Sequence, residues 1–125
     1  MAANYRTSLK TTRMTAVRDD IDSGAGAGYI EICTSAYGTV LATITLADPC
    51  GSVTGDTLTF TMPKSDTSAD ATGTAAIARI KESTGTVIVQ GLTVGTSGTD
   101  IILSSLAITA GDTVTLSSAT ITHSA

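Results

Sequence analysis

Alternation between apolar and polar residues is clearest over residues 74–90, where the sequence predicts a β-hairpin. A four-residue loop over 82–85, with Gly85 in the left-handed conformation that glycine adopts at no steric cost, places Ile80 opposite Val87. The predicted core face consists of Ala78, Ile80, Val87 and Val89. The opposite face is too apolar to be only solvated, and we expect it to contact another subunit. Its residues are Ile77, Arg79, Lys81 and Ile88.

A short helix is predicted near the N-terminus, from Thr7 or Ser8 to about Ser23. Either of the first two hydroxyls can cap the free amides of the first turn. The sequence GAGAG at residues 24–28 cannot continue a regular helix, so the helix should end before it. The residues expected on the core-facing side are Leu9, Met14, Val17 and Ile21.

Short alternating segments after residue 28 predict a series of strands. Residues 29–34 should point Ile30 and Ile32 inward and pair with residues 40–47. Further strands are expected at 57–62, 101–103, 106–108 and 113–122, with polar connections at 64–73 and 91–99. About seven or eight short strands with regularly spaced turns indicate a mainly β protein, an antiparallel β-sandwich or jelly-roll-like domain.

The chain length of 125 residues suits one domain. We expect residues 1–22 to form an N-terminal arm and short helix, and residues 23–125 a single β-sandwich domain. Threonine makes up about a fifth of the chain and aromatic residues only 3%, a composition that favours strands and turns over helices. A surface rich in hydroxyls suits a protein held against neighbours, although ordinary β-domains share it.

Positive charge is concentrated at the N-terminus of an otherwise acidic chain. The net charge of −4 argues against nucleic-acid binding, because neutralising phosphates requires a clustered positive surface. Four of the seven cations, however, lie in the first 18 residues. We expect this segment to dock on a partner, and the alternative is a solvated helix face. The candidate contact residues are Tyr5, Arg6, Lys10, Arg13 and Arg18.

The two cysteines, Cys33 and Cys50, fall in different predicted elements, and their spacing leaves open whether they form a disulfide. We expect reduced, structural thiols, because the chain lacks the disulfide-dense pattern of small secreted proteins. No apolar run approaches the length of a membrane span, and the polar, basic N-terminus does not resemble a signal peptide. We therefore expect a soluble protein made in the cytosol, with no membrane partner.

Residue types that carry chemistry are sparse, and we expect neither enzymatic activity nor a cofactor. The GAGAG sequence follows a predicted helix and opens a strand, the reverse of a dinucleotide-binding loop. The single histidine, His123, is two residues from the C-terminus, and no zinc-binding spacing can be written. A glycosidase or a sugar-binding module would normally need aromatic rings that stack on sugar, which are scarce here.

Calcium binding is the remaining metal alternative. Asp66 and Asp70 share one predicted loop, and a second acidic group at the end of the helix consists of Asp19, Asp20 and Asp22. Neither group matches the ligand spacing of an EF-hand loop, and loop acids are usually solvated. The acids at the helix end are unfavourable to the helix dipole, so either they pair with other groups or the helix is marginal on its own.

The order of several short sequences resembles a known family. The chain contains LADP at 46–49, DTSADATGTA at 66–75, ARI at 78–80, VGTSGTD at 94–100 and ITAGD at 108–112. Together with the N-terminal helix and the strand YIEICT, this order is similar to that of small β-sandwich proteins encoded among the structural genes of tailed bacteriophages and prophages. None of these sequences is a catalytic signature, and the resemblance lies in their joint order over nearly the whole chain.

This resemblance implies a structural virion protein. The implied role is a capsid decoration or cement protein, which is made in the host cytoplasm, binds the major capsid protein at the capsid surface and stabilises the head. It also implies a homo-oligomer, with a trimer favoured over a dimer. The alternatives are a tail- or fibre-associated virion module that contacts the host surface, and a carbohydrate-binding β-sandwich module.

Overall fold

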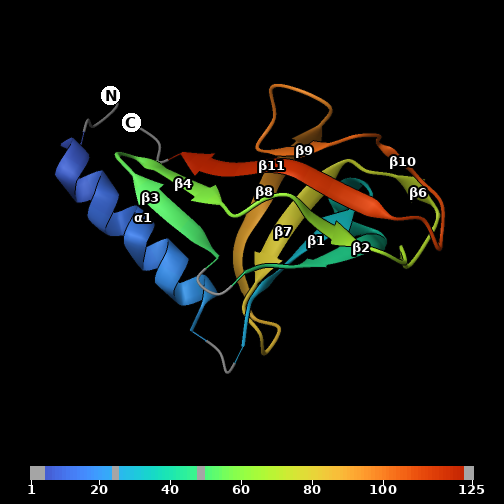
Figure 1. The fold of residues 1–125 in the computed structure, drawn as a ribbon, viewed down its shortest axis with the longest axis horizontal. Coiled ribbons are helices and arrows are strands. Elements are labelled where there is room, and N and C mark those ends of the chain that lie inside the picture. The colour runs from blue at the N-terminus through green and yellow to red at the C-terminus, as the bar shows by residue number, and fades with distance from the viewer. Residues whose placement is uncertain (1–4, 24–25, 48–49, 123–125) are drawn as a thin grey trace.

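The computed structural model describes residues 5–23, 26–47 and 50–122, which form one helix, a short 3-10 turn and eleven strands (Figure 1). The elements are α1 (Thr7–Ile21), β1 (Tyr29–Cys33), η1 (Ser35–Tyr37), β2 (Val40–Thr45), β3 (Gly51–Thr54), β4 (Thr57–Phe60), β5 (Lys64–Asp66), β6 (Gly73–Thr74), β7 (Ile77–Lys81), β8 (Val87–Gly95), β9 (Ile101–Leu103), β10 (Ala107–Ile108) and β11 (Val114–Thr122). The predicted mainly β fold with one short N-terminal helix is confirmed.

Nine of these strands form one curled sheet in the order β2-β1-β7-β8-β9-β11-β4-β3, with β5 also paired to β11. All pairs in it are antiparallel except β8 and β9, which run parallel. Strands β6 and β10 form a separate two-stranded sheet. Most of the β structure is therefore one sheet that folds back on itself. Helix α1 lies along β3 and β4 (Figure 1).

Strand β11 links the two halves of the sheet. Its first residues pair with β5, with Leu116 opposite Lys64, and its last residues pair with β4, with Ile121 opposite Leu58. On its other edge it pairs with β9, where an irregularity after Leu116 shifts the register so that Ala119 becomes buried. One long strand thus holds β4, β5 and β9 in place.

The free edge of β2 is covered by the segment that follows β5. The Thr43 N–H donates to Asp66 Oδ2 at 3.0 Å, and the Asp70 N–H donates to the Leu41 carbonyl oxygen at 2.8 Å. Because β5 pairs with β11 at the same time, these bonds join one end of the sheet to its middle. The curled sheet therefore closes on itself, which protects an edge strand that could otherwise pair with other chains.

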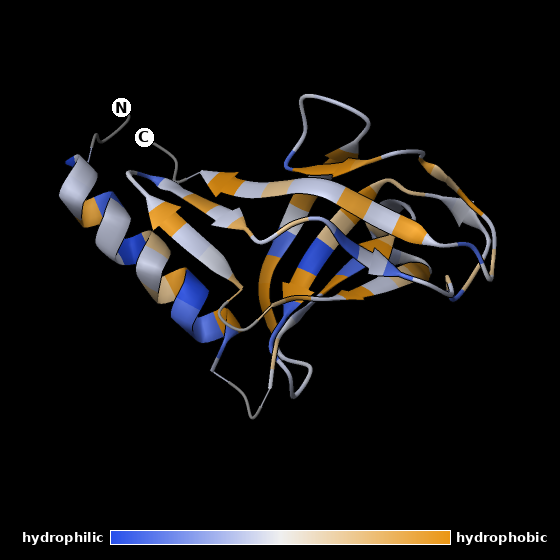
Figure 2. Cartoon of the chain, viewed as in Figure 1, coloured by the Kyte–Doolittle hydropathy of each residue, from blue (hydrophilic) through white to orange (hydrophobic). Residues whose placement is uncertain are grey.

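The core lies inside this curl. Apolar and polar residues alternate along most of β11, as the orange and pale bands of that strand in Figure 2 show. The largest side chains with almost no exposure come from nearly every element and include Ile21, Ile30, Ile32, Leu41, Ile44, Leu58, Ile80, Ile101, Leu103 and Leu116. The predicted pairing of β1 with β2 and the inward direction of Ile30 and Ile32 are confirmed.

The hairpin register differs from the prediction. The Glu82 N–H donates to the Thr86 carbonyl oxygen at 3.0 Å, which closes a loop of three residues rather than four, with Gly85 left-handed as expected (φ 99°). Lys81 therefore pairs with Val87, and Val87 is 39% exposed instead of buried.

Two irregularities in β8 then restore the core pairing. Ile80 pairs with Val89 and Ala78 with Leu92, and Gly91 adopts a positive φ of 76° between them. Leu92 is buried and occupies the place opposite Ala78 that the sequence assigned to Val89. Val89 itself is only partly buried against the core.

Other expectations also fail locally. Residues 64–66, predicted as part of a polar loop, form β5, and residues 51–54, for which no strand was predicted, form β3. The helix begins as predicted, but its N-cap is Arg6, with no side-chain capping hydrogen bond. Leu9, expected in the core, is 41% exposed.

Replacing Asp66 with alanine tests the closure of the sheet. In D66A the Thr43 and Ser68 N–H groups lose their acceptor, so we expect the free energy of unfolding to fall by about 1–3 kcal/mol in urea denaturation. The control D70A removes only an exposed 3.4 Å contact to Thr43 Oγ1 and keeps the backbone bond of residue 70. It should change stability by less than about 0.5 kcal/mol, and equal effects of the two variants would contradict the closure.

Candidate docking surface

Helix α1 is held on the β body by its inward side. Met14 and Ile21 are buried in the core, and Val17 packs against it. The Thr11 hydroxyl donates to the Gly55 carbonyl oxygen in the turn between β3 and β4. At the far end of the helix, the Cys50 N–H donates to Asp22 Oδ2 at 3.2 Å. The helix is therefore fixed at both ends, and its orientation is set by the core.

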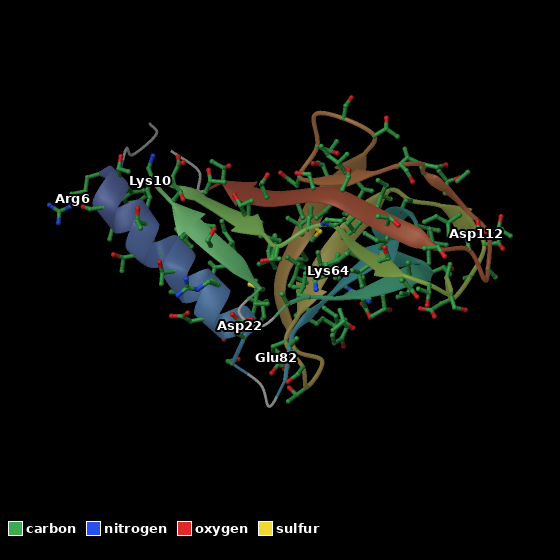
Figure 3. The ribbon with its side chains drawn as sticks, in the orientation of Figure 1. Arg6, Lys10, Asp22, Lys64, Glu82 and Asp112 are labelled. Atoms are coloured by element: carbon green, nitrogen blue, oxygen red, sulfur yellow. The ribbon has the colours of Figure 1, made fainter. Side chains whose placement is uncertain are left out.

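The outward side of α1 combines apolar and basic side chains. Tyr5 is 40% and Leu9 41% exposed, and the Arg13 guanidinium lies over the Tyr5 ring, 4.8 Å from its centroid. Arg6 is exposed, and Lys10 is half-buried beside it. Figure 3 places Arg6 and Lys10 at the same end of the molecule. We call Tyr5, Arg6, Leu9, Lys10 and Arg13 the α1 face.

The sequence placed Leu9 in the core and so left it out of this surface. Its spacing of four residues from Tyr5 and from Arg13 puts it on the same side of the helix as both, and this signal was present in the sequence. Arg18, by contrast, stands apart from the α1 face. It is half-buried and forms an ion pair with Asp19 at 3.1 Å. Four of the five predicted N-terminal contact residues thus belong to one surface.

The four predicted hairpin contact residues lie on β7 and β8, away from the exposed side of α1 (Figure 1). Arg79 Nε lies 2.7 Å and Lys81 Nζ 3.1 Å from the buried carboxylate of Glu31 on β1. Arg79 also stacks over the ring of Tyr37, at 4.9 Å. Both cations therefore make ion pairs within the chain, and a subunit contact of this face stays a prediction.

The remaining two hairpin residues are half-buried. Ile77 pairs with Cys33 of β1, and Ile88 packs against the core at the first irregularity of β8. Neither side chain is among the exposed large hydrophobic residues of the described chain.

We call Glu31, Arg79 and Lys81 the Glu31 cluster, and the charges of its members favour a structural role. Burial alone would raise the pKa of Glu31, but hydrogen bonds from Arg79 and Lys81, together with their charges, outweigh it and lower the pKa. The same hydrogen bond raises the pKa of Arg79. These three groups tie β1 to β7 on the side of the sheet opposite Ile30 and Ile80.

A group of acids lies at the end of the molecule far from Arg6, where Figure 3 labels Asp112. Asp66 and Asp70 both accept hydrogen bonds from Thr43, and the carbonyl oxygen of Asp112 accepts one from the Ala69 N–H at 2.8 Å. We call Asp66, Asp70 and Asp112 the acidic end. Within the described residues no group of three His, Cys, Asp or Glu side chains is arranged to hold a metal ion.

A small pocket of about 110 Å³ adjoins Asp112. Its wall is formed mainly by residues around β9, β10 and the start of β11, including Leu103, Ser105, Ala107, Ile108, Asp112 and Val114. Leu103, Ile108 and Val114 are buried, so the accessible wall of the pocket is mostly polar.

Both thiols are free and buried, which confirms the expectation of reduced, structural cysteines. Burial raises the pKa of Cys33, and burial together with the negative charge of Asp22 raises the pKa of Cys50 to about 12. Neither thiol is therefore activated as a nucleophile. Asp22 Oδ1 is buried with no hydrogen-bond partner among the described residues. His123 lies outside the described residues.

The Glu31 cluster predicts a pH dependence of stability. Because its pKa is lower in the folded state, Glu31 stabilises the protein above the pKa of the unfolded carboxyl, and this contribution is lost as the pH falls through the folded pKa. We expect E31Q to lower the free energy of unfolding by about 1–3 kcal/mol at pH 7. Its stability should also fall less steeply between neutral pH and about pH 3 than that of the unmodified protein, measured by urea denaturation.

The exposed acid Asp19 supplies the control for this experiment, since its ion pair with Arg18 is solvated. D19N should change stability by less than about 0.5 kcal/mol at pH 7. An acid-side slope in E31Q as steep as in the unmodified protein would show that the Glu31 pairs do not stabilise the fold.

Comparisons of the chain with protein-family models, with curated proteins and with solved structures found no match. In the described part of the chain, no helix is long and apolar enough to cross a membrane.

Proposed function

We propose that this protein is a structural virion protein, a capsid decoration or cement protein that binds the major capsid protein and stabilises the phage head. The observation that carries the proposal is the α1 face, where Tyr5 and Leu9 are exposed among the three cations Arg6, Lys10 and Arg13. Aromatic residues and arginine are enriched at protein interfaces, so this face suits assembly with an acidic protein surface.

The resemblance of the sequence to small β-sandwich virion proteins supports the same role. The mainly β body with a short N-terminal helix agrees with the fold that the resemblance implies. The closed edge of β2 also suits a protein that must stay unaggregated at high local concentration on a particle.

Stabilisation of a head follows from binding linkage. A protein that binds the assembled shell, and not its dissociated subunits, shifts the equilibrium toward the shell by the free energy of binding. When many copies bind one particle and also contact one another, weak individual contacts combine into strong retention. A small, rigid domain with a docking face at one end can supply such contacts.

The direct test adds purified protein to heads prepared without it and measures occupancy. Deleting residues 1–22 would remove Met14 and Ile21 from the core, so a surface variant is the sharper tool. In R6Q/K10Q/R13Q the three cations of the α1 face become neutral while its apolar residues remain. We expect this variant to lose about 1.4 kcal/mol of binding free energy, which weakens its binding to heads about tenfold and lowers occupancy at a fixed protein concentration.

The control K64Q neutralises a cation on β5, outside the α1 face, and should bind as the unmodified protein does. Circular dichroism should show the same fold for all variants. The proposal would be wrong if the unmodified protein did not bind heads or did not raise their resistance to heat. Imaging of labelled particles with signal on the tail instead of the head would equally contradict it.

A further inference from the structure

We propose that the α1 face binds the acidic end of a second copy of this chain, so that copies associate head to tail. This goes beyond the role on a phage head, because it requires no protein other than this chain.

The first support is the segregation of charge along the molecule. Residues 1–18 carry four cations and no acid, whereas residues 19–125 carry three cations and all eleven acids. Two of those three later cations, Arg79 and Lys81, are paired with Glu31. Acids therefore outnumber cations outside the α1 face, and an acidic surface of the same protein is a suitable electrostatic partner for that face.

The acceptor is the acidic end. Asp70 and Asp112 are exposed and Asp66 is half-buried, and all three are held together around Thr43 and Ala69 by hydrogen bonds. Lys64 is the only cation on the strand β5 that leads to them. Hydrogen bonds from backbone N–H groups fix the carboxylates of Asp66 and Asp112, so their negative charge is held in a constant position.

The second support is shape. The pocket beside Asp112 has a volume of about 110 Å³ and a mostly polar wall. Pockets for small-molecule ligands are usually about 300–1,000 Å³, so this one fits a single inserted side chain better. On the α1 face, Arg6 is an exposed cationic side chain, and Asp112 in the pocket wall is an acceptor of opposite charge for such a group.

The geometry makes the contact head to tail. Arg6 and Lys10 lie at one end of the molecule and Asp112 at the other (Figure 3). Each copy then contributes its α1 face to one neighbour and its acidic end to the other. Because these two surfaces lie at opposite ends, the contacts lead to open rows of copies. A symmetric pair through two α1 faces would bring like charges together, which is unfavourable.

Sedimentation velocity of the purified full chain tests the inference. We expect association that increases with protein concentration up to about 1 mM, the range of weak contacts. Raising the ionic strength from about 0.01 M to about 1 M shortens the Debye length roughly tenfold, and we expect association to weaken at least tenfold. Monomers at every concentration would overturn the proposal, and so would association that salt does not change.

Mixing two variants tests the head-to-tail geometry. R6Q/K10Q/R13Q lacks the basic face, and D70N/D112N lacks two charges of the acidic end while the asparagine at 112 can still accept the Thr109 N–H. Each variant alone should be monomeric, whereas their mixture should form one-to-one dimers and nothing larger, because each has one intact surface. No dimers in the mixture, or association of either variant alone, would overturn the proposal.

The control D19N removes an exposed acid from α1 and should associate as the unmodified protein does. This experiment uses no phage particle, so its result and that of the head-binding assay are independent. Heads that bind the protein while it stays monomeric in solution would contradict only the contact between copies. Self-association without binding to heads would contradict only the proposed function.

Discussion

The structure depends on the closure of one sheet edge. The Thr43 N–H bond to Asp66 and the Asp70 N–H bond to Leu41 attach β2 to the segment after β5, while β5 itself pairs with β11. A curled sheet without these bonds would leave an unpaired strand edge and an open core. With them, the body that carries α1 is closed, and the core that receives Met14 and Ile21 is complete.

This closed body explains why α1 can present a functional face. The helix has little amphipathic character of its own, because threonine and charged residues dominate it, so packing against β3 and β4 determines which side is buried. Met14 and Ile21 point inward, and Tyr5 and Leu9 consequently point outward among cations. Asp66 and Asp70 of the acidic end lie on the segment that closes the sheet, and the Ala69 N–H of the same segment donates to the Asp112 carbonyl oxygen, so these contacts stabilise the fold and hold the negative charge together.

Sequence patterns predicted the parts of the fold where hydrophobic alternation or a special residue is strong. The helix, the pairing of β1 with β2 and the left-handed Gly85 follow from such signals. Strands β3 and β5 were missed because Gly, Ser, Thr and Lys give them no apolar alternation, and tertiary pairing alone makes them strands. The predicted four-residue loop of the β7–β8 hairpin was wrong because the irregularity at Gly91 lets Leu92, rather than Val89, take the buried place opposite Ala78. Likewise, the basic residues of the α1 face and the four-residue spacing that puts Leu9 beside Tyr5 and Arg13 were visible in the sequence, whereas the acidic end depends on the tertiary arrangement.

A reconstruction of decorated heads by electron cryo-microscopy tests the central claim most directly, namely that a closed β body presents α1 as an assembly surface on the capsid. We predict density for this β domain on the outer surface of the head, with the α1 face buried in a contact with the capsid protein or with the acidic end of a neighbouring copy. Density confined to the tail, or a head-bound domain whose α1 face is surrounded by solvent, would contradict it.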